Sequence, residues 1–575
     1  MKALGRLSWG FALLVLLLAV TGVAVADSGP QSQVTRGDPF ASCPAPPDVF
    51  GGVVFPSTEP EVWLAANPAD PSNLIGSIQQ DRWSDGGAQG LVAPYSKDGG
   101  RSWNETPLPF SVCASPYYSG KVLRDPFTGR PYDRASDPWV DIGPDGTAYA
   151  VSISFNADDN GGSVGAATSS DGGRTWHNQQ NIVAEDANDP SFPFNDKESD
   201  TADPVRAGTA YAVWDRLQNI PCPPGVPPAS GNSDDRVFQQ GGAAPAAAAT
   251  AVSAAALDCF DGPGTLSRTT NFGRTWSTPI TIVPTAANEQ TIGNEIVVDP
   301  NTGTVYDFYM YVHADNSLTI EDVASHDRGR TWGPRQLVSD SQTIGIADPV
   351  TGAPIRTGDI IPQPAIDPRS GQLYVVWQDA RANATDPNQD ALFISTSRRG
   401  GVTGSWSAPA VVNEPDDEAA FTAAVKVLGN GSVAVEYYVL RSQAGKTRGA
   451  PARQAGVLPA TRPTGTSKSK AGVLRTGIVL RVTDGPGITF RRPEQSIGDD
   501  FNMLAAPFAS GYFTGDYEGL AVDVRDTRRV HAFFTATNCI NTRCAAVQGF
   551  DDAGDPIASN APNPTDVFSP DLRAG

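Results

Sequence analysis

Three segments of the sequence place an aspartate directly before an arginine or one residue away from it. They are Asp81-Arg82, Asp215-Arg216 and Asp379-Ala380-Arg381, each at the end of an apolar run. A guanidinium group offers a planar fork of donors that matches a carboxylate, so converging arginines would hold a carboxylate ligand. We therefore predict that Arg82, Arg216 and Arg381 bind substrate. The alternative is that each arginine forms a structural ion pair with a neighbouring acid.

A tyrosine late in the chain lies between two acids. Tyr517 stands in the segment GDYEGL, residues 515–520. A tyrosine beside a carboxylate can be activated as a nucleophile when that carboxylate takes its proton. The alternative is a tyrosine that caps a strand.

These residues must be positioned by repeated elements, because one short motif recurs along the chain. The clear copies are SKDGGRSW (96–103), SSDGGRTW (169–176), TTNFGRTW (269–276) and SHDRGRTW (325–332), and weaker copies are STSRRGGVTGSW (395–406) and TDGPGITF (483–490). The Asp or Asn side chain can bond backbone N–H groups across a hairpin, glycine supplies a positive φ, and the Trp ring can pack between sheets. Because the motif repeats, we expect a structural role rather than catalysis for Asp98, Trp103, Asp171, Trp176, Asn271, Trp276, Asp327 and Trp332.

Strand-like segments of similar pattern precede and follow these motifs. The second strands of the predicted units are LIGSIQQDR (74–82), TAYAVSIS (147–154), TAYAVWDR (209–216), TVYDFYMYV (304–312), QLYVVWQDAR (372–381), SVAVEYYVL (432–440) and RVHAFFTAT (529–537). Tandem four-stranded units predict an all-β fold, a β-propeller of four-stranded antiparallel blades. We favour seven blades, with six as the alternative if the last unit is a cap.

The last unit lacks a fourth strand, so we expect PDVFGGVVFPS (47–57) to close the ring from the N-terminal side. The repeated motifs occupy the turns of one face, so a site is expected among the connections of the opposite face. Two insertions, residues 217–264 and 441–475, fall on that face. The second insertion is basic and is interpreted as a flexible loop or, alternatively, as an electropositive flap.

The N-terminal 26 residues have the pattern of a signal peptide. Lys2 and Arg6 precede an apolar run that ends in Ala24-Val25-Ala26, a pattern that signal peptidase cleaves. An uncleaved anchor is the alternative. The predicted organisation is therefore a signal peptide at 1–26, a leader at 27–46, the propeller at 47–550 and a polar, disordered tail at 551–575.

Six cysteines agree with export to an oxidising compartment. We expect local disulfides between Cys222 and Cys259 and between Cys539 and Cys544, which leaves Cys43 with Cys113, although six cysteines allow 15 connectivities.

The net charge of −21, from 42 basic and 63 acidic residues, argues against nucleic-acid binding. Acids in the predicted connections could bind structural calcium, but no twelve-residue EF-hand pattern is present, and we expect no cofactor and no metal. We expect a monomer, without membrane attachment once the signal is cleaved.

The repeated motif resembles the Asp box of the sialidase (neuraminidase) superfamily, also called the bacterial neuraminidase repeat. This resemblance implies a β-propeller and removal of terminal sialic acids, with an arginine triad, a Tyr–Glu nucleophile pair and an Asp acid/base. By position, it implies Tyr517 as nucleophile and Glu198 as its base.

Several features depart from the superfamily pattern. No Phe-Arg-Ile-Pro segment precedes the first box, so Arg82 is assigned as the first triad arginine by its position alone. The acid/base aspartate has no motif match either, so Asp81 or Asp85 is assigned to this role by position. Sialidases have six blades. The predicted function is a secreted, sialidase-like glycoside hydrolase that acts on terminal sugars of extracellular glycans or glycoproteins. The alternative is a non-catalytic Asp-box propeller that binds a glycan or a protein.

Overall fold

The computed structural model describes residues 32–44, 52–228, 259–381, 389–398, 400, 402, 404–415, 417–441, 473–537 and 565–573. The predicted signal peptide, the Cys539–Cys544 pair and most of both insertions lie outside these residues. No described helix is long and apolar enough to cross a membrane.

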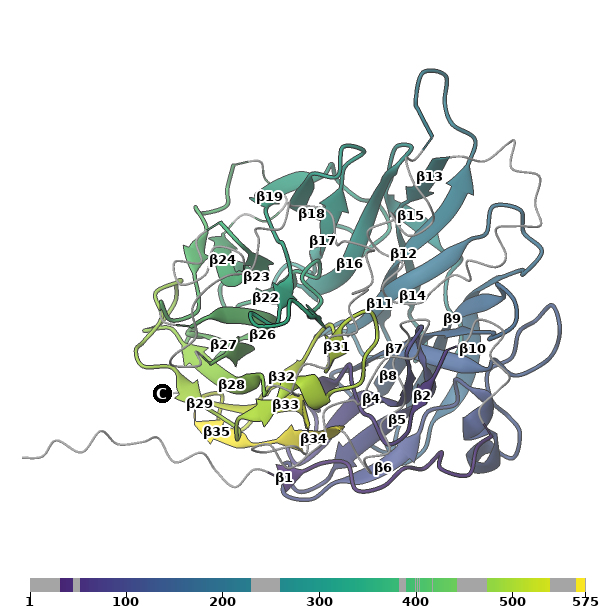
Figure 1. Ribbon diagram of the computed structural model, residues 1–575, viewed down its shortest axis with the longest axis horizontal. Helices are drawn as coiled ribbons and strands as arrows, with labels where there is room; N and C mark the ends of the chain where they lie inside the picture. The colour runs from purple at the N-terminus through teal and green to yellow at the C-terminus, as the bar shows by residue number, and fades with distance from the viewer. Residues whose placement is uncertain are drawn as a thin grey trace, which may run out of the picture.

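The fold is almost entirely antiparallel β-structure, arranged as successive meanders of four strands around a common centre (Figure 1). The first three meanders contain the following strands: β3 (Trp63–Ala66), β4 (Leu74–Trp83), β5 (Ala88–Ser96) and β6 (Asn104–Pro107); β7 (Arg134–Ile142), β8 (Ala148–Phe155), β9 (Gly162–Ser169) and β10 (His177–Glu185); β11 (Phe194–Ala202), β12 (Ala210–Ile220), β14 (Gly264–Thr269) and β15 (Ile280–Val283).

The next three meanders repeat the same order along the chain. They contain β16 (Glu289–Val298), β17 (Val305–Val312), β18 (Leu318–Ser325) and β19 (Gln336–Ser341); β22 (Gln363–Ile366), β23 (Leu373–Asp379), β24 (Ala391–Ser397) and β25 (Ala410–Val411); β26 (Ala419–Val427), β27 (Val433–Leu440), β28 (Arg475–Val482) and β29 (Gln495–Ser496). The predicted second strands coincide with β4, β8, β12, β17, β23 and β27, which confirms the sequence pattern in these units.

The last meander draws its strands from both ends of the chain. Its strands are β32 (Gly519–Val522), β33 (Arg529–Thr537), β34 (Thr565–Ser569) and β1 (Ser32–Gln33), and β34 pairs with both β33 and β1. Its second strand, β33, is the predicted one. The prediction that the N-terminal side closes the ring is therefore confirmed, but the predicted segment was wrong: β2 (Val54–Phe55) pairs with β4 of the first meander instead.

This arrangement also corrects two of the predicted boundaries. Ser32–Gln33 fall in the predicted leader but form part of a sheet, and residues 565–573 of the predicted disordered tail form β34 and β35 (Asp571–Arg573).

The remaining elements decorate the meanders. They are β13 (Cys259–Gly262), β20 (Ile346–Ala347), β21 (Pro354–Arg356), β30 (Phe501–Asn502), β31 (Tyr512–Phe513) and the 3-10 helices η1 (Val112–Tyr118) and η4 (Met503–Ala505). Strands β20, β21 and β31 form a small sheet of their own, which joins the connection before β22 to the connection before β32.

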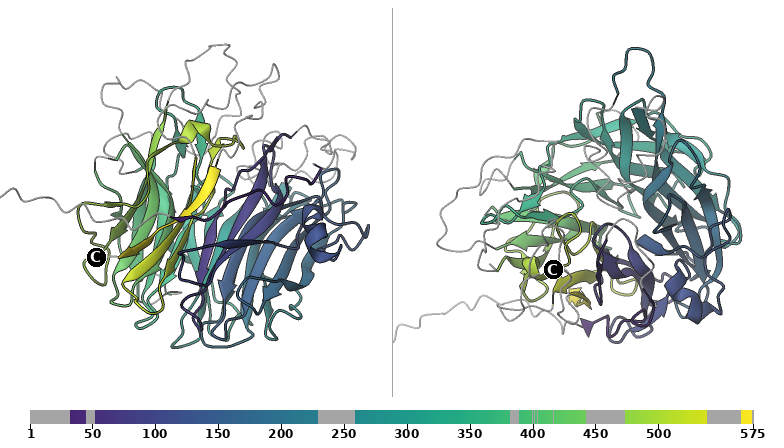
Figure 2. Two further views of the ribbon diagram at one scale, coloured as in Figure 1. Left: turned by 90° about the horizontal axis from the view of Figure 1, so that it is seen from below. Right: turned by 45° about the vertical axis from the view of Figure 1, so that its right-hand side comes forward.

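The innermost strands make a closed circle. Strands β3, β7, β11, β16, β22, β26 and β32 each contact the next in chain order, and β32 contacts β3. Figures 1 and 2 show the purple N-terminal sheet beside the yellow and green C-terminal one. The fold is therefore a β-propeller, and its strand pattern supports our prediction of seven blades.

The Asp-box motifs are the turns between the third and fourth strands of the first four meanders. In the second box, Asp171 accepts hydrogen bonds from Thr175 N at 3.0 Å and from Thr175 Oγ1 at 2.7 Å, and Ser169 Oγ accepts one from Gly173 N at 3.0 Å. The equivalent Asp98, Asn271 and Asp327 accept from the backbone N–H of their own box hydroxyl residues in the same way, and Asn271 Nδ2 donates to the Thr275 hydroxyl. These hydrogen bonds hold the turn between the third and fourth strands in its conformation, which is a structural role.

The Trp of the first box lies at the closure of the ring. The rings of Trp103 and Phe533, in β33, have centroids 5.6 Å apart, and Ser32 Oγ donates to Gly100 O at 3.0 Å. The Trp176 side chain of the second box is also buried, whereas Trp276 and Trp332 are half-buried. The boxes therefore fasten the meanders to one another.

Two disulfides are present among the described residues. Cys43 bonds to Cys113 and Cys222 bonds to Cys259, which confirms these two predicted pairs. The first disulfide ties the segment that follows β1 to the first meander.

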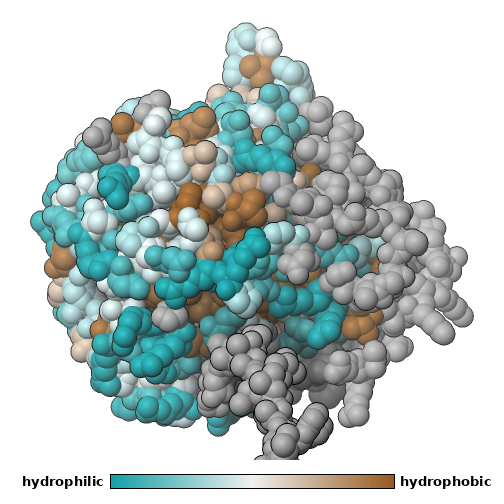
Figure 3. All heavy atoms as spheres, turned by 90° about the vertical axis from the view of Figure 1, so that its left-hand side faces the viewer, coloured by the Kyte–Doolittle hydropathy of each residue, from teal (hydrophilic) through white to brown (hydrophobic). Residues whose placement is uncertain are grey.

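The outer surface shown in Figure 3 is mostly hydrophilic, with small and separate apolar patches. Large exposed apolar side chains are few among the described residues.

Replacing Gly173 by alanine tests the packing of a box on the preceding meander. Gly173 has φ +93°, and a Cβ there would lie 2.9 Å from the Cβ of Tyr95. A left-handed backbone costs an alanine ~1–2 kcal/mol and overpacking adds ~1–3 kcal/mol, so the free energy of unfolding should fall by about 3 kcal/mol in chemical denaturation. Gly99→Ala is the matched control, because Gly99 has φ +74° and open space around a Cβ. It should lose only ~1 kcal/mol, and equal losses in both variants would contradict the packing argument.

Candidate active site

A break in the regular pairing near the start of four of the inner strands positions the central side chains. The pairing of β7, β11, β16 and β26 with their neighbours shifts register near these starts, as it does at β-bulges. Asp137 and Lys197, inside these shifts, and Glu61, just before β3, have φ of +51°, +49° and +56°. Bulges re-aim side chains, and strained backbone of this kind gathers at functional sites.

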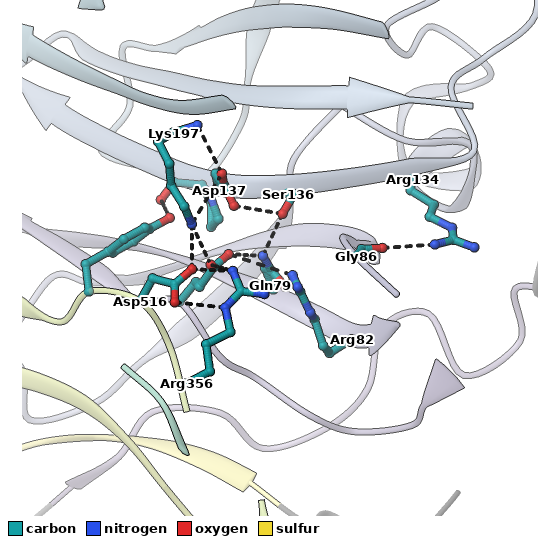
Figure 4. Close-up of polar contacts among 12 residues, drawn as sticks. Gln79, Arg82, Gly86, Arg134, Ser136, Asp137, Lys197, Arg356 and Asp516 are labelled. Carbon is teal, nitrogen blue, oxygen red and sulfur yellow. Dashed lines mark hydrogen bonds and ion pairs between the residues drawn. The ribbon is translucent and has the colours of Figure 1, made fainter. Parts of the chain in front are cut away.

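Lys197 is the hub of a buried charged cluster (Figure 4). Its Nζ lies 2.6 Å from Asp516 Oδ2, 3.3 Å from Glu61 Oε1 and 3.6 Å from Asp137 Oδ2. These acids come from three other parts of the ring: Glu61 precedes β3, Asp137 lies in β7 and Asp516 precedes β32. The ring closure therefore brings residues 319 positions apart into contact.

Two arginines complete the cluster. Arg356 Nε donates to Asp516 Oδ1 at 2.9 Å, and its Nη2 also bonds to Asp516. Arg82 Nη1 donates to Gln79 Oε1 at 2.9 Å and lies 4.0 Å from Glu61 Oε2. Both guanidinium groups lie over the ring of Phe513, at 4.4 Å and 4.9 Å from its centroid. We call Glu61, Arg82, Asp137, Lys197, Arg356 and Asp516 the central cluster.

The environment drives the acids of the central cluster into different protonation states. Burial, followed by the charge of Asp137, raises the pKa of Glu61 to about 8 against the opposing charge of Lys197. Burial also acts to raise the pKa of Asp516, but the charges of Arg356 and Lys197 outweigh it and hold this pKa well below its usual range. At neutral pH, Glu61 is therefore protonated and Asp516 is ionised.

The cluster carries a surplus of positive charge in this state. Burial would raise the pKa of Asp137, but Lys197 and the hydrogen bonds from Glu61 and Ser136 lower it, so Asp137 is ionised. Two ionised acids then face the three cations Arg82, Lys197 and Arg356. An anionic group on a ligand would balance the remaining charge.

An aromatic group packs next to the central cluster. Trp63 and Trp139 stack with ring centroids 3.7 Å apart, and the Tyr517 ring lies 5.0 Å from that of Trp139. The Tyr517 hydroxyl donates to Pro138 O at 3.3 Å. Burial, and then the charges of Glu61 and Asp137, raises the pKa of Tyr517, so this hydroxyl is protonated at neutral pH.

Of the residues predicted from sequence, Arg82 lies in the cluster and Tyr517 lies beside it. Glu198 follows the hub residue Lys197 and is buried, and burial, followed by the charge of Asp137, raises its pKa. No hydrogen bond joins Glu198 to Tyr517 among the described residues. The tyrosine–glutamate hydrogen bond of this region is formed instead by Tyr438 and Glu518, both buried between the last two meanders.

Asp81, predicted as the acid/base, makes its contacts outside the cluster. Its Oδ1 accepts from Ser57 N at 2.7 Å and its Oδ2 accepts from Gln89 Nε2 at 3.2 Å. Burial, and then the charge of Asp38, raises its pKa to about 7.

The other two predicted arginines have partners of their own. Arg216 Nε lies 2.9 Å from Glu185 Oε1, and Arg381 Nη2 lies 2.9 Å from Asp379 Oδ2. Arg381 therefore pairs with the neighbouring acid Asp379, whereas Arg216 pairs with Glu185 and not with the adjacent Asp215, which bonds Thr291. No contact in the described part of the chain joins either arginine to Arg82, so neither is included in the site proposed below.

Glu61, Asp137, Lys197 and Arg356 were not predicted from the sequence, and Asp516 was noted only as one of the two acids that flank Tyr517. One signal was available: Glu-Val-Trp at 61–63 and Asp-Pro-Trp at 137–139 share an acid two residues before a Trp. Aligning the first strands of the units on these Trp residues would have exposed the bulge position.

The described residues contain no group of three or more His, Cys, Asp or Glu side chains arranged to hold a metal ion.

The comparisons with known proteins concern the repeats and the overall architecture. Residues 265–450 match the family model of the BNR repeat-like domain, a segment that includes the third and fourth Asp boxes. No curated protein sequence matches the chain.

Solved structures are similar at low sequence identity. A protein of unknown function from Dyadobacter fermentans is 12% identical, covering 92% of this chain and 99% of that one, with a TM-score of 0.40. A Hadza microbial sialidase is 12% identical, covering 89% of this chain and 95% of that one, with a TM-score of 0.38. An α-L-arabinanase from Penicillium chrysogenum is 13% identical, covering 67% and 93%, with a TM-score of 0.36.

Proposed function

We propose that this BNR-repeat propeller is a secreted glycoside hydrolase that acts on glycans at its central cluster. One observation carries the proposal: Glu61 and Asp516 both contact the amine of Lys197, yet their pKa values are driven in opposite directions. Glycosidic cleavage needs one carboxyl group that donates a proton and a second, ionised one that stabilises or attacks the cationic centre.

The central cluster and its aromatic neighbours suggest a role for each residue. Protonated Glu61 would donate to the leaving oxygen, and ionised Asp516 or Asp137 would face the developing positive charge. Tyr517, with Glu198 as its base, is the competing nucleophile that the sialidase resemblance implies. The protonated hydroxyl of Tyr517 requires such a base.

The substrate class follows from charge and shape. The surplus positive charge from Arg82, Lys197 and Arg356 suits a sugar that carries a carboxylate, and sialosides are the first candidates. Trp63 and Trp139 are buried and stack on each other, so they support the wall of the central cluster rather than contact the sugar. The two disulfides support secretion, because such bonds persist in oxidising compartments.

The test is release of a fluorophore from an aryl sialoside by the purified mature chain. Glu61→Gln and Tyr517→Phe are assayed beside it, with the surface variant Asp526→Asn as control. Loss of a general acid lowers the rate ~10²–10⁴-fold, so Glu61→Gln should lose activity on this scale while Asp526→Asn keeps it. Loss in Tyr517→Phe of the same size would assign the nucleophile to Tyr517.

The alternative, a propeller that binds glycans without cleaving them, makes a different prediction. Neither aryl sialosides nor a panel of other aryl glycosides would be hydrolysed by the wild type. Binding of intact sialylated glycans on an array would then favour the alternative.

The pH dependence of the reaction follows from Glu61. A carboxyl group with a pKa of about 8 keeps its proton below that pH and loses it above. We therefore expect kcat/KM to fall as the pH rises through about 8, in a pH–rate profile of the wild type. A profile that is flat between about pH 7 and 10 would exclude Glu61 as the proton donor.

A further inference from the structure

A strained threonine lies beside the central cluster. Thr422, in β26, has φ +45°, a conformation that branched side chains rarely adopt. Its inner-strand position, where the pairing between β26 and β27 shifts register, matches those of Asp137 and Lys197. Such backbone costs ~1–3 kcal/mol and persists only where the surroundings compensate for it. A glycine would adopt the same φ without strain.

Two hydrogen bonds of Thr422, supported by a third between its two partners, compensate for the strain. Its N–H donates to Gln378 Oε1 at 2.9 Å, and its hydroxyl donates to the carbonyl oxygen of Thr357 at 2.7 Å. Gln378 Nε2 in turn donates to Thr357 Oγ1 at 3.1 Å. All three residues are buried, so these bonds do not compete with bulk water.

The bonded residue, Thr357, directly follows Arg356 of the central cluster. The next residue, Gly358, has φ +59°, and a Cβ there would lie 1.9 Å from the carbonyl oxygen of Asp516. The backbone of 356–358 therefore lies in close contact with Asp516, the residue that the Arg356 guanidinium binds. Thr422 and Gln378 hold this backbone from the other side.

We propose that Thr422 and Gln378 are positioning residues, which fix the 356–358 backbone so that the Arg356 guanidinium faces Asp516 and the substrate. The inference rests on the proposed function in one respect: it assigns Arg356 to substrate binding. The placement of Arg356 itself does not depend on that function.

The decisive variants are Thr422→Gly and Thr422→Ser. Glycine relieves the backbone strain but removes the hydroxyl and a buried methyl group, so the two effects on the free energy of unfolding oppose each other and the net change should be small. A displacement of about 1 Å at a reacting group can cost ~10²-fold in rate, so we expect kcat/KM for the aryl sialoside to fall by about 100-fold. Thr422→Ser keeps the hydroxyl and should restore wild-type kcat/KM.

This combination separates positioning from a purely structural role, which would lower stability and activity together. Gln378→Met, of similar size but without donors or acceptors, should reproduce the loss of kcat/KM. Wild-type kcat/KM in a folded Thr422→Gly variant would overturn the proposal.

A crystal structure of Thr422→Gly beside the wild type tests the inference even if the wild type hydrolyses nothing. We expect the Arg356 Nε to move away from Asp516 Oδ1 in the glycine variant and to stay in the serine variant. An unchanged Arg356 in the glycine variant would refute the positioning role, whereas an inactive wild type with a displaced Arg356 in the variant would refute only the hydrolase.

Discussion

Replacing Asp516 by asparagine is expected to lower the free energy of unfolding by about 3–5 kcal/mol and to abolish the proposed hydrolysis. Asp516 is the ion partner nearest to both Lys197, at 2.6 Å, and Arg356, whose Nε donates to it at 2.9 Å. All three side chains are buried, so the variant leaves two cations without their main counter-charge. Removing one partner of a buried ion pair is costly for this reason. Urea-induced unfolding of both proteins at neutral pH measures the loss.

Two further variants show whether the loss arises from charge. Asp526→Asn removes an exposed partner of Arg528 and should leave the unfolding midpoint unchanged. The double variant Asp516→Asn with Lys197→Met removes a buried cation as well and should recover part of the stability. An unfolding midpoint equal to that of the wild type in Asp516→Asn alone would show that the central cluster is not an ion network.

The contribution of Asp516 also has a defined pH window. Because its pKa in the folded state is held below the ordinary value, the stabilisation is complete above the ordinary carboxyl range. It is lost as the pH falls below that range. The difference in stability between wild type and Asp516→Asn should therefore shrink on acidification.

Removing the disulfide between Cys43 and Cys113 is expected to cost about 4 kcal/mol of stability. The bond closes a loop of 70 residues. Breaking it increases the conformational entropy of the unfolded chain, which stabilises the unfolded state by about this amount. The bond also holds the segment that follows β1, the strand that closes the last meander. Chemical denaturation of the Cys43→Ser, Cys113→Ser double variant under oxidising conditions measures the loss.

The second disulfide offers a matched comparison, because it spans only 37 residues and lies within one region of the third meander. The loop-entropy argument predicts a difference of only ~0.5 kcal/mol between the two bonds. A much larger loss for the Cys43–Cys113 variant would show that ring closure itself depends on this bond. No loss in that variant would mean that β1 and the Asp boxes close the ring without it.

The repeated units could be predicted because each one contains a strand and a turn motif that are recognisable from its own local sequence. Second strands such as 147–154 and 432–440 are runs of Val, Tyr and Ala long enough to be recognised, and the Asp boxes mark the hairpins between them. The closing strand could not be recognised in this way. Ser32–Gln33 is two residues long and polar, and its strand conformation is imposed by pairing with β34.

The site was only partly predictable, for a related reason. Tyr517 and Arg82 stand out by their sequence neighbours, and both lie at the centre of the ring. Lys197 does not stand out, because its importance comes from a register shift and from an acid 319 residues away. Arg216 and Arg381 share the local pattern of Arg82, yet partners nearby in space hold them elsewhere. Local pattern indicates which side chains are available, and the tertiary structure decides which of them meet.

The closure of the ring by β1 and β34 has a consequence for how the chain is made. Ser32 pairs with Ser569, so the last meander lacks its outer strand until residue 569 has been synthesised and the two ends have met. Until then, β33 lacks its outer neighbour β34, and its unpaired edge is open to other chains. Contacts of such long sequence separation form slowly. Crowded overexpression should therefore yield aggregates of nearly complete chains rather than of short ones.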